Sequence, residues 1–583
     1  MKKFKFFSLA FAALMLGACS SDDIAEGPQS GPEWNAEGQG YINLAINLPS
    51  QPASRANDNY DDGTPEEYDV KDATLILFSD GKVNSAYSMD LNFALDGSSD
   101  NITTTARITQ QINSMTGTIE ALVVLNNNGV FTVGEGGALT VGGAPMADKS
   151  LDELNKAISD NIGTNKNWHN NGFLMSNAVL ATAIGGSVEP TNATAKTLVP
   201  IDANKIYKTE AEASNNPAAN IYVERAEAKV TVTNSLGGET TDGSDLAYTI
   251  DGWCLDNTNN TSKLVRTVDR FDTWKGYASN AAIALPANKY RFVGSTAVGT
   301  NVAGNETYYR IYWGDDYNYS STAAGALTTV GGQTVADGSL IKDIDGNTPD
   351  YCFENTTDLA TMRENNCTRV VVKASFNGGK PFYTVDGDRA TVWTAEDAEA
   401  EAASRIVADA AFQTWASTNV QAGQTLESTD LEVTLSDEAG VAEVEAVTLT
   451  EDGQAKLNED ADFATANAVD LGNENIDLKY YADGEAYYSV WVSHFGEDGT
   501  PWNGDEAQTP AAGNVYPGGD QNYLGRWGML RNNWYEVELT GIRSLGEPTV
   551  SEATGDTIDK LESFISARIN VLSWTKRTQS AEL

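Results

Sequence analysis

The sequence predicts a mainly β protein, made of tandem Greek-key β-sandwich domains with a few short helices. Two observations carry this prediction. Short runs in which every second residue is apolar recur along the chain, as in strands that bury one face. Turn-forming residues separate these runs, and the chain holds 52 glycines in 583 residues. With 41% hydrophobic residues the chain can bury real cores, and its length is enough for two to four domains.

Residues 1–18 predict a secretory signal peptide. A basic leader precedes the apolar stretch from Phe6 to Met15, which is too short to span a bilayer. The small residues before Cys19 resemble the lipobox of bacterial lipoproteins, so we expect lipid on Cys19 to hold the protein at the outer membrane. The alternative is an ordinary signal peptide with an incidental cysteine. The segment Ser20-Ser21-Asp22-Asp23 resembles the acidic surface-export tag of such lipoproteins, or forms a solvated linker.

An N-terminal strand is expected from Tyr41 to Leu48, where the alternation is typical of a half-buried strand. Its apolar face carries Ile42, Leu44, Ile46 and Leu48. Arg55 is the lone basic residue of this region and follows the strand closely. A cut between Arg55 and Ala56 would make residues 19–55 a propeptide that contains the strand.

The first domain is expected over residues 56–221. Strands are predicted from Ala73 to Phe78 and from Thr118 to Leu125, each followed by a turn. Ser150 and Glu153 have the spacing of a capping box and predict one short amphipathic helix. A further strand is predicted from Val223 to Val232, and we place the domain boundary near residue 222.

The second domain is expected over residues 222–583. Thr394 and Asp397 begin an Ala- and Glu-rich helical island that runs to about Ala416 and predicts a helical insertion over 394–416. Its stripe of Val407, Ala411 and Trp415 is more typical of a docking face than of a ligand site. Further strands are predicted over 431–435, 487–492, 534–539 and 565–574.

Charge and cysteine content exclude several classes of protein. Lys and Arg number 38 and Asp and Glu number 82, so the net charge is 38 − 82 = −44. Such a surface repels phosphate backbones, which excludes nucleic-acid binding. Beyond Cys19 the cysteines are Cys254, Cys352 and Cys367, which allow at most one disulfide. The sequence does not decide whether Cys352 and Cys367 form a disulfide. Disulfides are not expected to hold this fold together.

We find no motif that predicts an enzyme, a metal site or a cofactor site. His169 and His494 lie in no metal-spaced cluster and beside no nucleophile motif. Residues 343–346 look like part of a calcium loop, but a polar turn is favoured because Ile341 stands where an oxygen ligand is needed. Trp491 and Trp527 could line a sugar site, although such residues usually pack a core.

The two terminal strands predict assembly. While the Tyr41 to Leu48 strand stays attached, it closes the sheet and outcompetes any free strand, because a tether raises its effective concentration. A cut at Arg55 would let it leave, and a strand from another molecule could fill the groove. The candidate donor repeats the alternation through Ile565, Ala567, Ile569 and Val571. The alternative is an ordinary terminal strand of its own domain.

The order of lipobox, alternating strand, lone arginine and two-part β-rich body resembles the fimbrillins, the subunits of type V pili in Bacteroidia. Local matches within these ranges carry the resemblance: 173–177, 223–230, 487–491 and 529–537. The resemblance implies two transthyretin-like sandwich domains and a lipoprotein precursor trimmed at Arg55 by an arginine-specific protease. It further implies polymerisation by strand exchange, with the displaced strand at 41–48 and the donor within 565–574.

The expected function is therefore a structural subunit of a cell-surface fimbria that supports adhesion and biofilm formation. Its expected partners are other copies of itself, accessory fimbrial subunits, and host or bacterial surface receptors. A second hypothesis is a monomeric, surface-anchored glycan-binding or adhesin lipoprotein that keeps residues 20–55. A third, a secreted hydrolase, predicts turnover that depends on one carboxylate, and no catalytic constellation supports it.

Overall fold

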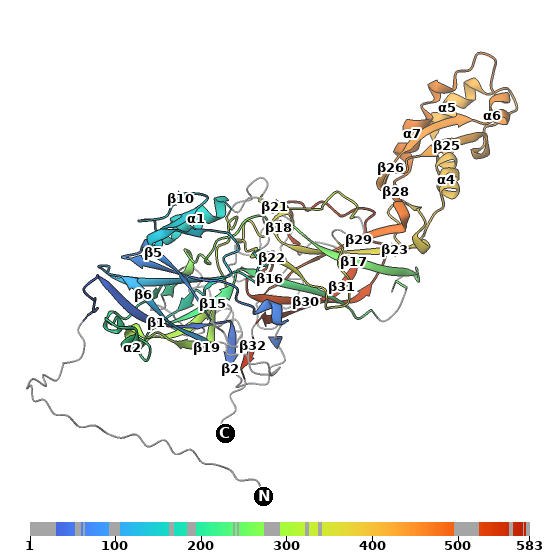
Figure 1. Ribbon diagram of the computed structural model, residues 1–583. Helices are drawn as coiled ribbons and strands as arrows, with labels where there is room; N and C mark the ends of the chain where they lie inside the picture. Colours follow the sequence, from blue (N-terminus) through green and yellow to red (C-terminus); the bar gives the residue numbers. More distant parts are fainter. Residues whose placement is uncertain are drawn as a thin grey trace, which may run out of the picture.

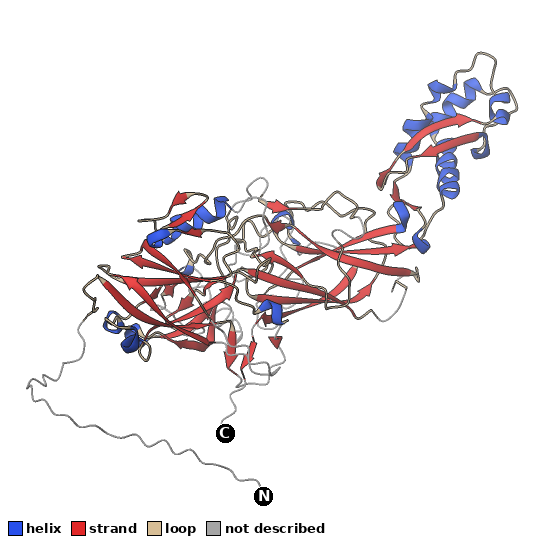
Figure 2. Ribbon diagram, in the orientation of Figure 1, coloured by secondary structure: helices blue, strands red, loops and turns tan. Residues whose placement is uncertain are grey.

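The computed structural model describes residues 31–52, 60–61, 64–91, 105–161, 168–183, 194–236, 240–241, 244–272, 292–320, 326–335, 341–494, 524–558, 564–574 and 576–578. Two adjoining β-rich bodies are visible, and a smaller module projects from the second (Figure 1). Strands dominate both bodies, whereas helices gather in the projecting module (Figure 2). The expectation of a mainly β protein is confirmed, while the Greek-key and transthyretin-like topology stays a prediction.

A mixed sheet organises the first body, in the order β5-β4-β7-β11-β15-β1-β6, with β14 also paired to β7. Its strands are β1 (Gln39–Asn47), β4 (Ala73–Ser79), β5 (Lys82–Met89), β6 (Thr105–Asn113), β7 (Ile119–Leu125), β11 (Met175–Asn177), β14 (Val199–Pro200) and β15 (Pro217–Arg225). Strand β1 runs parallel to β15 and antiparallel to β6. Asp80 and Gly81 form the predicted β4–β5 turn with φ of 49° and 74°, the positive values that such hairpins need.

The second body has two sheets, ordered β22-β16-β30-β31-β3 and β17-β23-β29. Their strands are β3 (Tyr60–Asp61), β16 (Glu227–Asn234), β17 (Tyr248–Asp256), β22 (Asp350–Phe353), β23 (Arg369–Phe376), β29 (Glu485–Trp491), β30 (Asn533–Ile542) and β31 (Ile565–Trp574). Val230 and Val537 of the first sheet share one buried core with Trp253 and Val370 of the second. The predicted strands over 487–492, 534–539 and 565–574 are therefore present, with bounds within a few residues.

The strand predicted from Val223 to Val232 is two strands. Strand β15 ends at Arg225 in the sheet of the first body, and β16 begins at Glu227 in a sheet of the second. Ala226 lies between them, 1% exposed, and its N–H donates to the carbonyl of Leu174. The apolar alternation continues through this point because both strands are buried, so it could not indicate the change of sheet.

Strands from beyond the predicted domain boundary near residue 222 also pair with strands that precede it. Strands β19 (Val293–Thr300) and β20 (Thr307–Ile311) join β12 (Leu180–Ala181) and β13 (Ala195–Lys196) in one sheet. The core behind the first sheet accordingly mixes Ile76 and Leu122 with Leu264 and Trp313. Small sheets of β8 (Thr132–Val133), β9 (Leu139–Val141) and β10 (Ala144–Pro145), and of β18 (Thr258–Asn259) and β21 (Leu327–Thr328), complete these bodies.

The helical insertion predicted over 394–416 is part of a larger projecting module between β23 and β29. Its elements are β24 (Phe382–Val385), α4 (Ala395–Ala408), α5 (Ala410–Asn419), β25 (Leu431–Leu435), β26 (Gly440–Ala442), β27 (Val444–Leu449), α6 (Glu451–Ala455), α7 (Ala468–Asn475) and β28 (Leu478–Tyr481). These elements share a core of their own that includes Ile406, Phe412 and Leu478. The module therefore packs as an independent unit.

The stripe expected from Val407, Ala411 and Trp415 is correct for Val407 and Trp415, which pack against the module core, and wrong for Ala411. Asp409 has an extended ψ of 138°, ends α4, and caps α5 by accepting from the N–H groups of Ala411 and Phe412. The break turns Ala411 outward, so it is exposed, while Phe412 is fully buried. An aspartate competes for backbone N–H groups, which explains why the helix stops here.

Two short helices lie against the first body. Helix α1 (Leu151–Asn161) begins at the predicted capping box: Glu153 N–H donates to Ser150 Oγ at 3.2 Å, and Ser150 N–H donates to Glu153 Oε2 at 2.8 Å. Helix α2 (Glu210–Ala213) lies beside β1 in Figure 1. The position of α2 bears directly on the burial of β1.

Candidate functional site

The candidate site consists of β1, β31 and the surfaces on which these two strands lie. The predicted N-terminal strand is present as β1, and its apolar side chains are buried in the first body. Ile42, Leu44 and Ile46 are 0% exposed and Leu48 is 3% exposed. They pack in the core that also contains Leu75. We call the position of β1 between β15 and β6 the β1 slot.

Strand β1 is buried on both faces, which corrects the expectation of a half-buried strand. On the face away from Leu44, Asn43 is 2% exposed and Ala45 is 4% exposed. The Asn43 side-chain amide donates to Thr109 Oγ1 at 3.1 Å and to the carbonyl of Ser214, which follows α2, at 3.3 Å. A helix of four residues gives almost no periodic signal, so the sequence could not predict this cover.

Strand β1 also joins β6 to the rest of the sheet. The two strands pair along their whole length, from Gln39 opposite Asn113 to Asn47 opposite Thr105. Among the described strands, β6 pairs with β1 alone. Removing β1 would therefore uncover the edge of β15 and leave β6 without a ladder partner, so the vacated slot would present two unpaired strand edges.

The expected lipidation and processing residues, Cys19, Arg55 and Ala56, lie outside the described residues. The strands on either side of the expected cut are described. Strand β2 (Ser50–Pro52) precedes Arg55 and pairs in parallel with β32 (Lys576–Thr578). Strand β3 follows Arg55 and pairs in parallel with the end of β31. Both sides of the cut are thus held against the C-terminal end of the chain.

The candidate donor strand is β31, and it lies in its own domain. It pairs antiparallel with β30, from Asn533 opposite Ser573 to Ile542 opposite Ile565. Ile565 is 3% exposed, whereas Ala567 and Ile569 are only half-buried. The side chain of Val571 lies outside the described side chains. In this conformation β31 behaves as a terminal strand, and any donation requires that it first leave β30.

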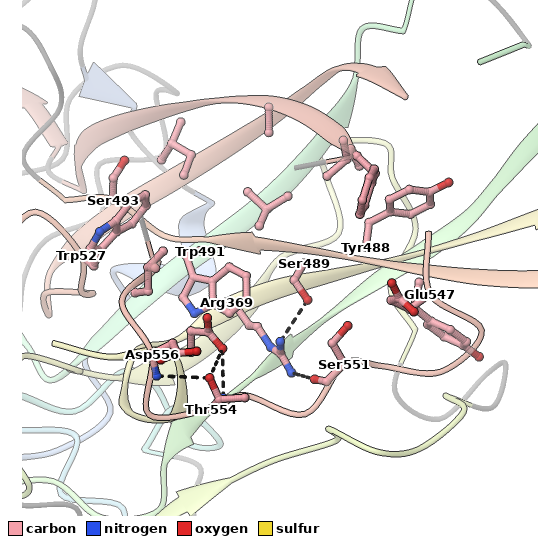
Figure 3. A pocket seen from close by; sticks show the side chains of 18 of the residues that line it. Arg369, Tyr488, Ser489, Trp491, Ser493, Trp527, Glu547, Ser551, Thr554 and Asp556 are labelled. Atoms are coloured by element: carbon pink, nitrogen blue, oxygen red, sulfur yellow. Dashed lines mark hydrogen bonds between the residues drawn. The ribbon is translucent and has the colours of Figure 1, made fainter. Parts of the chain in front are cut away.

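A cavity of about 1130 Å³ lies beside the inner face of β31 (Figure 3). Its wall includes the donor face, with Ile565, Ala567 and Ile569, and the aromatic rings of Trp491 and Trp527. Two tryptophans noted in the sequence are thus brought together, although Trp491 is only 9% exposed and packs against buried neighbours. The cavity shows that β31 is less tightly packed than β1.

Two charged residues in the cavity wall, Arg369 and Glu547, have hydrogen-bond and ion-pair partners within the protein. Arg369 is fully buried and donates to Ser489 Oγ at 3.1 Å and to the carbonyl of Ser551 at 2.5 Å (Figure 3). It also pairs with Asp256 at 2.7 Å. Burial alone would raise the pKa of Glu547, but hydrogen bonds from Lys479 and Arg389 outweigh it and lower that pKa. The cavity wall is thus held by fixed ion pairs and hydrogen bonds.

Both histidines have structural partners. His169 Nδ1 lies 3.0 Å from the Glu227 carboxylate. His494 Nδ1 lies 2.8 Å from the hydroxyl of Tyr535, and burial, followed by the charges of Arg266 and Arg310, lowers the pKa of His494 to about 3.

The remaining candidate groups are also accounted for. Within the described part of the chain, no three His, Cys, Asp or Glu side chains converge as metal ligands would. Asp345 accepts from the N–H groups of Asn347 and Thr348, as in the polar turn that the sequence favoured. Cys254, Cys352 and Cys367 are buried and unbridged. In the same part of the chain, no helix combines the length and apolar character of a membrane span.

Comparison with known proteins identifies the C-terminal part of the chain. Residues 479–580, which contain β29, β30 and β31, match the family model described as the major fimbrial subunit protein type IV, fimbrillin, C-terminal. This confirms the resemblance on which the expected assembly rests. The family is one of structural, non-enzymatic proteins. No curated protein sequence matches the chain.

Three solved structures are among those that the comparison matches to this chain. A fimbrilin (FimA) from Porphyromonas gingivalis is 10% identical, covers 92% of this chain and 99% of its own, and has a TM-score of 0.33. The C-terminally truncated tip fimbrial protein Mfa3 from the same organism is 9% identical, with 92% and 100% covered and a TM-score of 0.28. A candidate cell adhesion protein from Parabacteroides distasonis is 10% identical, with 92% and 98% covered and a TM-score of 0.34.

Proposed function

We propose that this chain, whose residues 479–580 match the fimbrillin C-terminal family model, is a fimbrial subunit that polymerises by exchanging a β-strand between copies. In this proposal it is exported as a lipoprotein acylated at Cys19 and is trimmed between Arg55 and Ala56 by an arginine-specific protease. The observation that carries the proposal is the place of β1: a strand upstream of Arg55 lies between β15 and β6 in a sheet whose other strands all follow Arg55.

The uncut chain is inert because its own strand occupies the slot. While β1 is tethered, its effective concentration is millimolar or higher, so a free strand cannot compete. Four buried side chains at about 1.5 to 3 kcal/mol each contribute on the order of 10 kcal/mol, before ordering costs, to holding β1 in place. After the cut, β1 can dissociate and be diluted, and a strand that remains attached to a neighbouring subunit can replace it.

The C-terminal strand of another copy is the replacement that the sequence favours. Ile565, Ala567, Ile569 and Val571 repeat the alternation of the β1 face. Such a strand would run parallel to β15 and antiparallel to β6, as β1 does. From residue 564 onward the chain carries three basic residues and one acidic residue, so a net charge of +2 enters a body that is strongly acidic.

One observation favours the alternative function, a monomeric anchored adhesin. Strand β31 is paired with β30 over its whole length, as a strand with no further role would be. In that case the protein keeps residues 20–55 and stays attached through Cys19. The half-buried state of Ala567 and Ile569 over a cavity supports strand exchange instead, because loose packing lowers the cost of departure.

The test combines proteolysis with a matched pair of variants. Trimming the wild-type protein with an arginine-specific protease is expected to give multimers that resist mild detergent. Arg55→Lys keeps the charge but removes the cleavage site, and is expected to stay monomeric. Arg543→Lys, at an exposed arginine elsewhere, is expected to assemble like the wild type. Monomers after complete trimming would favour the anchored adhesin.

A further inference from the structure

The C-terminal tail, defined here as β31 and β32, is held at its far end by the segment that the cut would remove. Ser50 lies opposite Lys576, Gln51 opposite Arg577 and Pro52 opposite Thr578. Among the described strands, β32 pairs with β2 alone. Strands β2 and β32 lie side by side below the junction of the two bodies (Figure 1).

The retained side of the cut pairs with two residues of the tail, one fewer than β2 does. Strand β3 pairs with the tail only at Tyr60 opposite Ser573 and Asp61 opposite Trp574. After a cut at Arg55, β3 would lie close to a new chain end, where backbone pairing frays readily. The firmer contact at the end of the tail is therefore the one that leaves with residues 19–55.

The end of the tail is the place where β31 would begin to separate from β30. A paired strand opens from its terminus, because breaking ladder bonds in its middle frees no chain. The terminus of β31 is at Trp574, and β32 continues directly beyond it. A partner on β32 therefore resists opening of the whole β30·β31 ladder. Once the end opens, Ala567 and Ile569 can follow more easily because they face the cavity.

We infer that β2 is a latch that holds the donor tail in the precursor, so that one cut frees the acceptor slot and the donor strand together. This inference rests on the proposed strand exchange and adds to it a control on the donor. A precursor in which only the slot were blocked could still donate its tail to an open subunit and end a growing fibre. A latched precursor can neither accept a strand nor donate its tail, so uncut copies do not interfere with assembly.

The test asks whether an uncut subunit can donate. Full-length precursor carrying Arg55→Lys cannot open its slot, so it can join a polymer only as a terminal donor. It is added in labelled form to trimmed wild-type protein during assembly. A second precursor carries Arg55→Lys with Gln51→Pro, which removes an N–H from β2 and its ability to form a ladder. A third carries Arg55→Lys with Gln51→Ala as the matched control.

The latch predicts that only the Gln51→Pro precursor is incorporated and shortens the polymers, with incorporation on the order of tenfold above the other two. Equal incorporation of all three, or of none, would overturn the latch. Strand exchange itself is checked separately in the same experiment: if trimmed wild-type protein alone forms no polymer, the proposed function fails, whatever the precursors do.

Hydrogen exchange gives a second readout that needs no assembly. In the Arg55→Lys precursor, backbone amides of residues 576–578 are expected to be protected. Their exchange should be on the order of tenfold faster after Gln51→Pro or after trimming of the wild type. Exchange in the interior of β1, around Leu44, should stay slow in the Gln51→Pro precursor, which shows that the variant is folded. Unchanged exchange at 576–578 would contradict the latch.

Discussion

Glu67 and Lys229 form a buried ion pair that ties the chain just after the expected cut to the second body. Glu67 Oε1 lies 2.8 Å from Lys229 Nζ, and the two side chains are 1% and 4% exposed. The hydroxyl of Tyr351 donates to the same carboxylate at 2.8 Å. The backbone carbonyl of Glu67 accepts from the Arg225 guanidinium at 3.0 and 3.1 Å. The retained chain is therefore held to the second body at Glu67.

Removing one partner of this pair is expected to destabilise the protein strongly. Glu67→Ala leaves the Lys229 ammonium buried without its carboxylate, and the free energy of unfolding should fall by about 3–5 kcal/mol. Denaturant unfolding measures the change. Lys156→Ala, which breaks an exposed pair with Asp160, serves as the control and should change the stability little, because solvent screens exposed ion pairs. Equal effects of the two variants would contradict the role given to Glu67.

The pair of His169 and Glu227 predicts a pH dependence of stability. Burial alone lowers the pKa of His169, but its hydrogen bond to the Glu227 carboxylate and the charge of that group outweigh burial and raise the pKa above 6.5. The folded protein thus binds this proton more tightly than the unfolded chain. The resulting stability is fully present below about pH 6.5 and is lost as the pH rises through the raised pKa.

His169→Gln is expected to remove this dependence. The difference in unfolding free energy between wild type and variant should be largest below about pH 6.5 and should shrink at higher pH. Using the difference between the two proteins cancels the contributions of groups that do not interact with His169, including His494. Denaturant titrations at several pH values provide the measurement. If the unfolding free energies of wild type and variant change in parallel above pH 6.5, His169 does not cause the pH dependence.

Core substitutions in β1 should affect the precursor but not the polymer. Leu44→Ala is expected to lower the stability of the uncut chain by about 2–5 kcal/mol, because it opens a cavity in the first core. The polymer no longer contains β1, so its resistance to detergent should be unchanged. Leu75→Ala, which faces the same core from the retained β4, should weaken both forms. A polymer weakened by Leu44→Ala would mean that β1 stays in place.

Enlarging the donor face should strengthen the polymer. In the alignment of the two alternating faces, Ala567 takes the place of the larger Leu44. Ala567→Leu would fill the space left in the slot and stabilise each interface between subunits by roughly 2 kcal/mol, at about 0.8 kcal/mol for each of the three added carbons. The monomer should tolerate the change because Ala567 borders the cavity. The temperature at which detergent-treated polymers dissociate should rise, and a fall would argue against this alignment.

Patterns within one element were predictable from the sequence. Strand β25 has the predicted bounds of Leu431 and Leu435, and the capping box of Ser150 and Glu153 is formed by both of its hydrogen bonds. The alternation before Arg55 predicted β1 and its buried face. These features depend on residues that are neighbours along the chain, so local periodicity and side-chain chemistry are enough to indicate them.

Relationships between distant segments were not predictable. The change of sheet at Ala226 and the parallel pairing of β1 with β15 depend on partners far away in the sequence. The break at Asp409 lies inside a stretch whose composition favours one continuous helix. Strands β2 and β32 have three residues each, too few for a periodic signal, so the contact between the propeptide and the tail emerges only in the structure.

The central claim is that the tail of one copy occupies the β1 slot of another after the cut. In the uncut chain Asn43 lies opposite Thr109, and their side chains are hydrogen-bonded. If Ile565 takes the place of Ile42, then Ser566 takes the place of Asn43. The most direct measurement uses a protein carrying Thr109→Cys and Ser566→Cys, oxidised before and after trimming at Arg55. We predict a disulfide between different chains that forms only after trimming, whereas trimmed multimers without this crosslink would contradict the claim.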